Sequence, residues 1–149
     1  MRKFLFISIK PEFANKILSK KKRIELRKNK PNARIGDYVL IYSTQPRKSV
    51  IGIAKIKNII DCNPNEMWEN HAEYLGIDKK RFFDYYNGHK KAIGIELSDV
   101  CKFKVSVPLQ EIKNTYPKFS PPQTYKYIPY FTTLKFYIEH LNFANISCN

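Results

Sequence analysis

The sequence predicts an α+β fold in which a small curled β-sheet or β-barrel carries flanking helices and a helical insertion. Segments in which every second residue is apolar recur along the chain, and this period is typical of strands that bury one face. Helix signals lie between these segments, and two expected helices follow one another without a strand between them. With 149 residues, the chain is long enough for one domain with a hydrophobic core. Strands mixed with helices in this way favour a small curled sheet or barrel.

The expected strands begin and end at turn signals. A Gly-Asp pair leads into the strand 38–43, and a Gln-Pro-Arg-Lys turn joins that strand to a long successor. Within the long strand, Gly52 indicates a bulge or a close approach of another backbone. We expect strands at residues 4–9, around Ile24 and Leu26, and at 38–43, 49–59, 92–97 and 100–107.

The expected helices begin with proline, with an acidic residue in the first turn, or with an Asn or Asp cap. Pro11 suits the first helical position and Glu12 favours the first turn. Asn63 and Asp78 are the caps of two helices that form the insertion. We expect helices from residue 11, at 63–74 and 78–86, a short turn at 109–114 and a closing helix at 132–141. The proline-rich and aromatic residues 116–127 are expected to be irregular but ordered.

Positive charge is concentrated near the start of the chain. The formal net charge is +14, and residues 1–35 hold 12 Lys or Arg against Glu12 and Glu25, so that +10 lies in the first quarter. Such a field favours polyanionic partners, above all nucleic acid. A membrane surface is a weaker candidate, because no expected helix combines a basic face with a broad apolar one. A lysine-rich composition unrelated to binding is a third explanation, although the clustering speaks against it.

The remaining composition predicts a cytoplasmic protein without a cofactor. No apolar run approaches the roughly 20 residues that span a bilayer, and the apolar part of residues 1–10 is too short for a signal peptide. The cysteines and histidines lack the spacing of a zinc site or a disulfide framework. They are Cys62, Cys101, Cys148, His71, His89 and His140. Cys101 shares the parity of its apolar neighbours, so we expect it to be a buried small residue.

The basic stretch at residues 19–28 contains the first candidate site. Its two apolar residues alternate with charged ones, which places Arg23, Glu25 and Arg27 on the same face of a strand. A carboxylate between two guanidiniums can hold both cations in fixed positions. Lys22 lies at the turn into this strand, where a bend can bring its amine near the same cluster. The alternative is a solvated, charged edge strand, because natural sheets use lysine to protect exposed edges.

The same stretch resembles the signature of the ASCH domain family, Gly-x-Lys-x-x-Glu-x-Arg. Lys22, Glu25 and Arg27 match it in register, whereas Lys20 stands where the family has glycine. Residues 35–44 are similar to the family's Gly-Asp turn and second core strand.

The resemblance implies a PUA-like fold, of which the ASCH domain is one branch. The resemblance covers a core of about residues 4–107. We therefore expect residues 1–149 to form a single ASCH domain with a C-terminal extension at 108–149.

Two further groups of residues are expected near the charged stretch. Tyr42, Ser43 and Thr44 end a core strand, where small hydroxyl groups can read a base edge. The aromatic candidates come from the insertion and the tail: Trp68, Phe82, Phe83, Tyr85, Tyr86, Tyr125 and Tyr127. Cations combined with aromatic faces are typical of proteins that bind single-stranded nucleic acid. The alternative for Phe82, Phe83 and Tyr86 is the hydrophobic core, and Trp68 fits either a core or a pocket wall.

The resemblance implies a binding module first, since ASCH and other PUA-like domains are thought to bind RNA and some relatives recognise modified bases. RNA is favoured over DNA. The expected binding residues are Lys22, Arg23, Glu25, Arg27, Tyr42, Ser43, Thr44, Trp68 and Tyr86.

The alternative is a small hydrolase in which Lys22 and Glu25 are catalytic. Some ASCH proteins are reported to cleave RNA, and Lys22 and Arg27 could stabilise a phosphorane while Glu25 moves protons. Other ASCH proteins remove the acetyl group of 4-acetylcytidine with a lysine, a threonine and a glutamate. Here Glu25 stands at the position of the threonine nucleophile, and Glu73 matches the family's glutamate only approximately. We therefore rank RNA binding first, ribonuclease second and amidase third.

Overall fold

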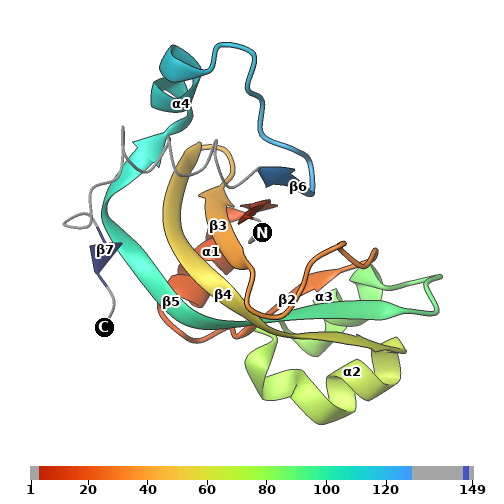
Figure 1. Ribbon diagram of the computed structural model, residues 1–149. Helices are drawn as coiled ribbons and strands as arrows, with labels where there is room; N and C mark the ends of the chain where they lie inside the picture. The colour runs from red at the N-terminus through yellow and green to blue at the C-terminus, as the bar shows by residue number, and fades with distance from the viewer. Residues whose placement is uncertain (1–3, 129–145, 148–149) are drawn as a thin grey trace.

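The computed structural model describes residues 4–128 and 146–147, which fold around one curled, mixed β-sheet (Figure 1). Within these residues the strands follow the order β2-β5-β4-β3-β1-β6, and β7 pairs with β5 outside this path. Only the β1–β3 pair is parallel. The strands are β1 (Phe4–Ile9), β2 (Ile24–Arg27), β3 (Tyr38–Ser43), β4 (Ser49–Cys62), β5 (Ala92–Pro108), β6 (Tyr125–Ile128) and β7 (Ile146–Ser147).

The helices flank this sheet, and two of them lie together at the end that carries β2 (Figure 1). They are α1 (Pro11–Leu18), α2 (Pro64–His71), the 3₁₀ turn η1 (Ala72–Tyr74), α3 (Lys79–Tyr85) and α4 (Leu109–Thr115). Both predicted caps are confirmed: the Asn63 side chain accepts a hydrogen bond from the backbone of Glu66, and Asp78 accepts one from Arg81. Side-chain caps that lie next to each helix in the sequence therefore fix where the two helices of the insertion begin.

Three hydrophobic clusters hold the elements together. The first joins α1 to one face of the sheet through Ala14, Ile17 and strand residues such as Ile41 and Ile95. The second lies on the opposite face and includes Tyr42. The third packs β2 against the helical insertion and contains Ile24, Leu26, Met67, Leu75, Phe82 and Tyr86. Because Ile24 and Leu26 anchor one side of β2 in the third cluster, strand alternation places Glu25 and Arg27 on the other side.

The structure differs from the expected elements in two places. Residues 92–97 and 100–107 form one continuous strand, β5, which stays paired to β4 through several register shifts near Asp99. Residues 125–127, expected to be irregular, form β6 together with Ile128 on the edge of β1. The expected helix at 132–141 lies outside the described residues.

Two cysteines of the described residues differ in their bonding state. Cys62 is a free thiol. Cys101 is buried as expected, but it is disulfide-bonded, which the odd and wide cysteine spacing did not predict. In residues 4–128 and 146–147, no helix is long and apolar enough to cross a bilayer, and no group of three acidic, His or Cys side chains is placed to hold a metal ion.

Gly52 is predicted to be sensitive to a single added methyl group. The β4–β5 register shifts beside it, and a Cβ on Gly52 would lie 2.8 Å from the Cys101 carbonyl oxygen and 2.7 Å from Leu18 Cδ2. The close approach expected from the sequence is therefore confirmed. We expect Gly52→Ala to lower the free energy of unfolding by about 1–3 kcal/mol, because the carbonyl cannot move without the strand. Urea unfolding measures this loss, and an unchanged midpoint would contradict the packing described.

Candidate functional site

The charged residues of β2 and the lysine that precedes the strand form a buried ion trio, which we define as Lys22, Glu25 and Arg27. Arg27 Nη2 lies 2.7 Å from Glu25 Oε2, and Lys22 Nζ lies 3.6 Å from Glu25 Oε1. The side chains of Lys22, Glu25 and Arg27 are only 2%, 8% and 11% exposed. Although β2 ends the strand order, these charges are not a solvated edge. The predicted approach of Lys22 to the strand residues is thus confirmed.

Lys22, which lies just before β2, is held by groups from other parts of the chain. Its amine donates to the backbone oxygen of Leu75 and lies 5.2 Å from the centre of the Phe13 ring. Gly76 packs directly on the lysine stem, since a Cβ there would lie 2.6 Å from Lys22 Cβ. Burial lowers the pKa of Lys22, and the neighbouring Glu25 carboxylate opposes that shift only in part. This lysine therefore gives up its proton more readily than a solvated lysine.

Arg27 is fixed at both its side chain and its backbone. Its Nη2 also donates to the Ser8 backbone oxygen at 2.8 Å, and the Tyr86 hydroxyl donates to the Arg27 backbone oxygen at 2.9 Å. The buried Nε of Arg27 has no hydrogen-bond partner in the described structure. A buried, unpaired guanidinium N–H is costly, so the desolvation of this donor is not compensated within the described structure.

Arg23 does not join the trio, which corrects the expectation that Glu25 lies between the Arg23 and Arg27 guanidiniums. Strand β2 begins only at Ile24, and the Arg23 guanidinium lies 5.0 Å from the centre of the Tyr74 ring. Its side chain is exposed, while its backbone hydrogen-bonds to Tyr74 and Leu97. Arg23 is therefore a surface cation stacked on an aromatic ring.

The hydroxyl group at the end of β3 is less accessible than expected. Tyr42 packs in the core beside Phe6, and Ser43 is fully buried with no hydrogen-bond partner for its Oγ in the described structure. Thr44 is partly exposed, and its backbone donates to Ile9. Because β1 pairs with β3, this strand end lies beside the Ser8 carbonyl that holds Arg27. Within residues 4–128, no hydrogen bond joins these hydroxyl groups directly to the trio.

Most aromatic candidates form the core of the insertion. Phe82 and Tyr86 are buried, and the Trp68 ring lies 5.2 Å from Phe82. The core alternative is confirmed for Phe82 and Tyr86, so neither presents a face to a base. Tyr85, an aromatic candidate outside the expected binding residues, is 37% exposed, and Lys28 Nζ lies 4.5 Å from its ring centre. Side chains of Tyr125 and Tyr127 lie outside the described residues.

Lys20 carries backbone strain where the family has glycine. Its φ is 65°, a left-handed conformation that costs a non-glycine residue about 1–2 kcal/mol. We expect Lys20→Gly to raise the free energy of unfolding by up to about 1 kcal/mol, since glycine's extra unfolded-state freedom offsets part of the gain. Thermal unfolding beside Lys21→Gly, which removes the same charge at an ordinary φ, isolates the effect. A loss of stability in Lys20→Gly would count against the strain.

Comparison with known proteins places the chain in a family. The ASCH domain model matches residues 7–117. An ASCH domain-containing ribonuclease of Zymomonas mobilis is 33% identical over 123 residues, which cover 83% of this chain and 82% of the relative. The crystal structure of ASCH from Zymomonas mobilis has a TM-score of 0.85 at 32% identity and covers 91% of this chain and 94% of that one.

A more distant structure supports the fold alone. Human THYN1, solved in complex with DNA containing 5-methylcytosine, has a TM-score of 0.58 at 11% identity, with 92% of this chain and 96% of that chain covered. The curled sheet, the flanking helices and these matches confirm the predicted PUA-like fold. By sequence and by structure, the chain belongs to the ASCH domain family.

Proposed function

We propose that this protein binds single-stranded RNA, in preference to DNA, and that it cleaves the bound strand. The observation that carries the proposal is the 33% identity, over 83% of the chain, to a relative that is itself a ribonuclease. The buried trio and the basic surface around β2 supply the chemistry that such an activity needs. We further propose a single ASCH domain with a core at 4–107 and an extension at 108–149, acting in the cytoplasm.

Binding would use the exposed cations that flank β2. These are Lys20, Lys21, Arg23, Lys28 and Lys30. Two of them lie against aromatic rings, Arg23 over Tyr74 and Lys28 over Tyr85. Phosphates can contact such cations while an unpaired base stacks nearby, which favours a single strand over a duplex.

Cleavage would use the trio as an electrostatic device. Arg27 is its outermost member, and its Nε is a donor without a partner in the described structure. A phosphate oxygen that reached this donor would be stabilised as charge builds up on the phosphorane, with Lys22 as a second cation in surroundings of low dielectric. Both Glu25 oxygens face cations, so its role here is to position them.

The positions of Glu25 and Glu73 do not support the amidase alternative. Glu25 has no hydroxyl to act as a nucleophile, and its carboxylate is paired with Arg27 and Lys22. Glu73, the approximate match to the family's glutamate, is exposed on η1. A ribonuclease is the enzyme that this trio supports best.

A salt-dependent titration tests binding, with labelled single-stranded RNA, duplex RNA and DNA compared at several salt concentrations. We expect affinity to fall steeply with salt, and Lys28→Met to reduce the slope of log K against log salt by about 0.7 if it contacts one phosphate of a single strand. Lys104→Met is the matched control, because Lys104 is an exposed lysine on β5. If Lys28→Met and Lys104→Met give the same slope of log K against log salt, the surface around β2 is not part of the binding site.

Strand integrity is read on a gel from the same tubes. Shortened single-stranded RNA supports cleavage. Strands that remain bound and intact would reduce the proposal to a binding module.

A further inference from the structure

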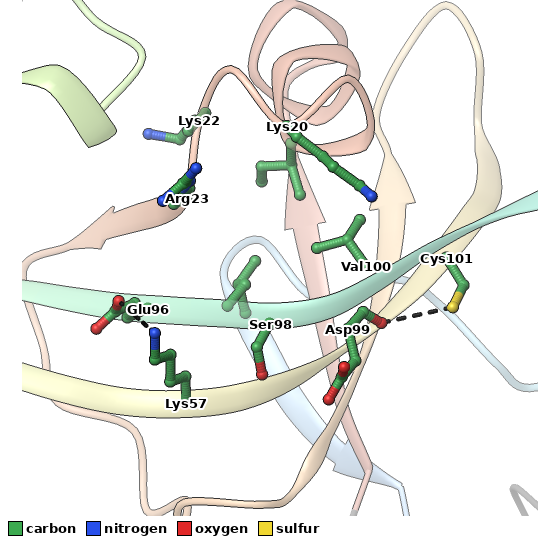
Figure 2. A pocket seen from close by; sticks show the side chains of 11 residues that line it. Lys20, Lys22, Arg23, Lys57, Glu96, Ser98, Asp99, Val100 and Cys101 are labelled. Atoms are coloured by element: carbon green, nitrogen blue, oxygen red, sulfur yellow. Dashed lines mark hydrogen bonds and ion pairs between the residues drawn. The ribbon is translucent and has the colours of Figure 1, made fainter. Parts of the chain in front are cut away.

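A hollow lies beside the trio and includes Lys22 in its lining. It has a volume of about 540 Å³ and lies between the end of α1, the start of β2 and the part of β5 around Asp99 (Figure 2). The Lys22 amine does not point into it, because that amine turns towards Leu75 and Glu25. This hollow, which we call the β5 pocket, therefore borders the trio: the Lys22 side chain is part of its lining, but the charged amine points away from it.

The lining of the β5 pocket combines three kinds of chemistry. Apolar side chains of Ile17, Leu97 and Val100 contribute one part. Cations lie around it, namely Lys20, Arg23 and Lys57. Glu96 and Asp99 add carboxylates, and Ser98 adds a hydroxyl. A ligand that matches this lining has an apolar flat part, an anionic part and a hydrogen-bond donor.

Glu96 is available as an acceptor. Its contact with Lys57 Nζ is 3.9 Å long, and the Lys57 side chain is 65% exposed, so this is a weak surface pair. Glu96 itself is 27% exposed and sits opposite Ile24 of β2 in the sheet. Its position on a paired strand fixes the carboxylate better than a loop would.

Arg23 is the cation best placed for an anion. Tyr74 stacks on its guanidinium, and both backbone groups of Arg23 are hydrogen-bonded to Tyr74 and Leu97. A guanidinium fixed in this way keeps its N–H groups for a phosphate while losing little side-chain freedom on binding.

We propose that the β5 pocket binds one nucleotide whose base carries an exocyclic amino group, with the phosphate on Arg23 and Lys20 and the amino group donating to Glu96. The apolar residues then contact the base, and carboxylates accept from amino groups such as cytosine N4. The ligand class rests on the proposed function, because RNA supplies such a nucleotide. A free nucleotide has the same chemistry and is the second source.

Cytidine and uridine monophosphate are the probes, since the two differ at the position where cytosine carries its amino donor and uracil an acceptor. We expect the wild-type protein to bind the cytidine nucleotide about tenfold more tightly, and Glu96→Gln to remove that ratio. Glu111→Gln is the matched control, because Glu111 is an exposed acid on α4. Amide chemical shifts of residues 98–100 should move with the cytidine nucleotide, which reports the location without any variant.

The outcomes separate this inference from the proposed function. If the protein binds free cytidine monophosphate more tightly than uridine monophosphate, the hollow is a nucleotide pocket. If it discriminates only between cytidine and uridine hexamers, the hollow is a subsite for an RNA strand. If the protein cleaves RNA but binds cytidine and uridine ligands equally well, the inference is overturned and the proposed function stands. A Glu96-dependent cytidine preference without RNA binding supports the inference and overturns the proposed function. If Glu96→Gln keeps the wild-type ratio of affinities for the cytidine and uridine nucleotides, the assignment of the pocket is overturned.

Discussion

Glu25→Gln is expected to lower the free energy of unfolding by about 3 kcal/mol or more. The substitution keeps the shape of the side chain but leaves Lys22 and Arg27 without their counter-charge, in sites where they are 2% and 11% exposed. Removing one partner of a buried ion pair is strongly destabilising, because the remaining charge stays out of water. Urea unfolding at neutral pH measures the loss.

The chain contains a matched control for this prediction. Glu12 also faces two cations, Arg81 at 2.8 Å and Lys16 at 3.6 Å, but its side chain is 45% exposed. Water can replace those contacts, so Glu12→Gln should change stability far less than Glu25→Gln. Equal losses in the two variants would show that burial does not set the cost.

A double variant separates charge from packing. Adding Lys22→Met to Glu25→Gln removes one of the two orphaned cations and keeps an apolar stem in the same space. We expect the double variant to recover part of the lost stability, which a double-mutant cycle quantifies. A loss equal to the sum of the single losses would mean that Lys22 and Glu25 do not interact.

The sequence predicts the trio because its members are close together in the chain. Lys22, Glu25 and Arg27 are separated by three and two residues, so a turn followed by a short strand brings them together without help from distant segments. The caps of the insertion are local for the same reason. The expectation that Glu25 lies between Arg23 and Arg27 was wrong, because Lys22 is the second cation beside Glu25, while Arg23 stacks on Tyr74 of the insertion.

The groups that hold the trio could not be predicted from the sequence. Leu75 binds the Lys22 amine from 53 residues away, and the Tyr86 hydroxyl reaches the Arg27 backbone across 59 residues. Such contacts depend on how the insertion packs on β2, which no local pattern encodes. The same limit explains β6, since an edge strand of four residues exists only because β1 offers it an unpaired edge.

Gly76→Ala is expected to slow RNA cleavage about 100-fold while leaving RNA affinity nearly unchanged. Gly76 has φ of +64°, and a Cβ there would lie 2.6 Å from Lys22 Cβ and 2.9 Å from Lys22 Cγ. The lysine stem must therefore shift, and a displacement of about 1 Å in a catalytic group can cost about 100-fold in rate. Single-turnover cleavage and a binding titration separate the two effects.

Gly88→Ala isolates the backbone cost of the same substitution. Gly88 has φ of +79°, but a Cβ there meets nothing within 4 Å, so this variant pays the left-handed penalty of about 1–2 kcal/mol without moving Lys22. At a temperature where both variants remain folded, Gly88→Ala should cleave RNA at the wild-type rate. Equal slowing in both would assign the effect to lost stability, and full activity in Gly76→Ala would exclude Lys22 from the chemistry. A selective loss in Gly76→Ala would tie cleavage to the position of one buried amine.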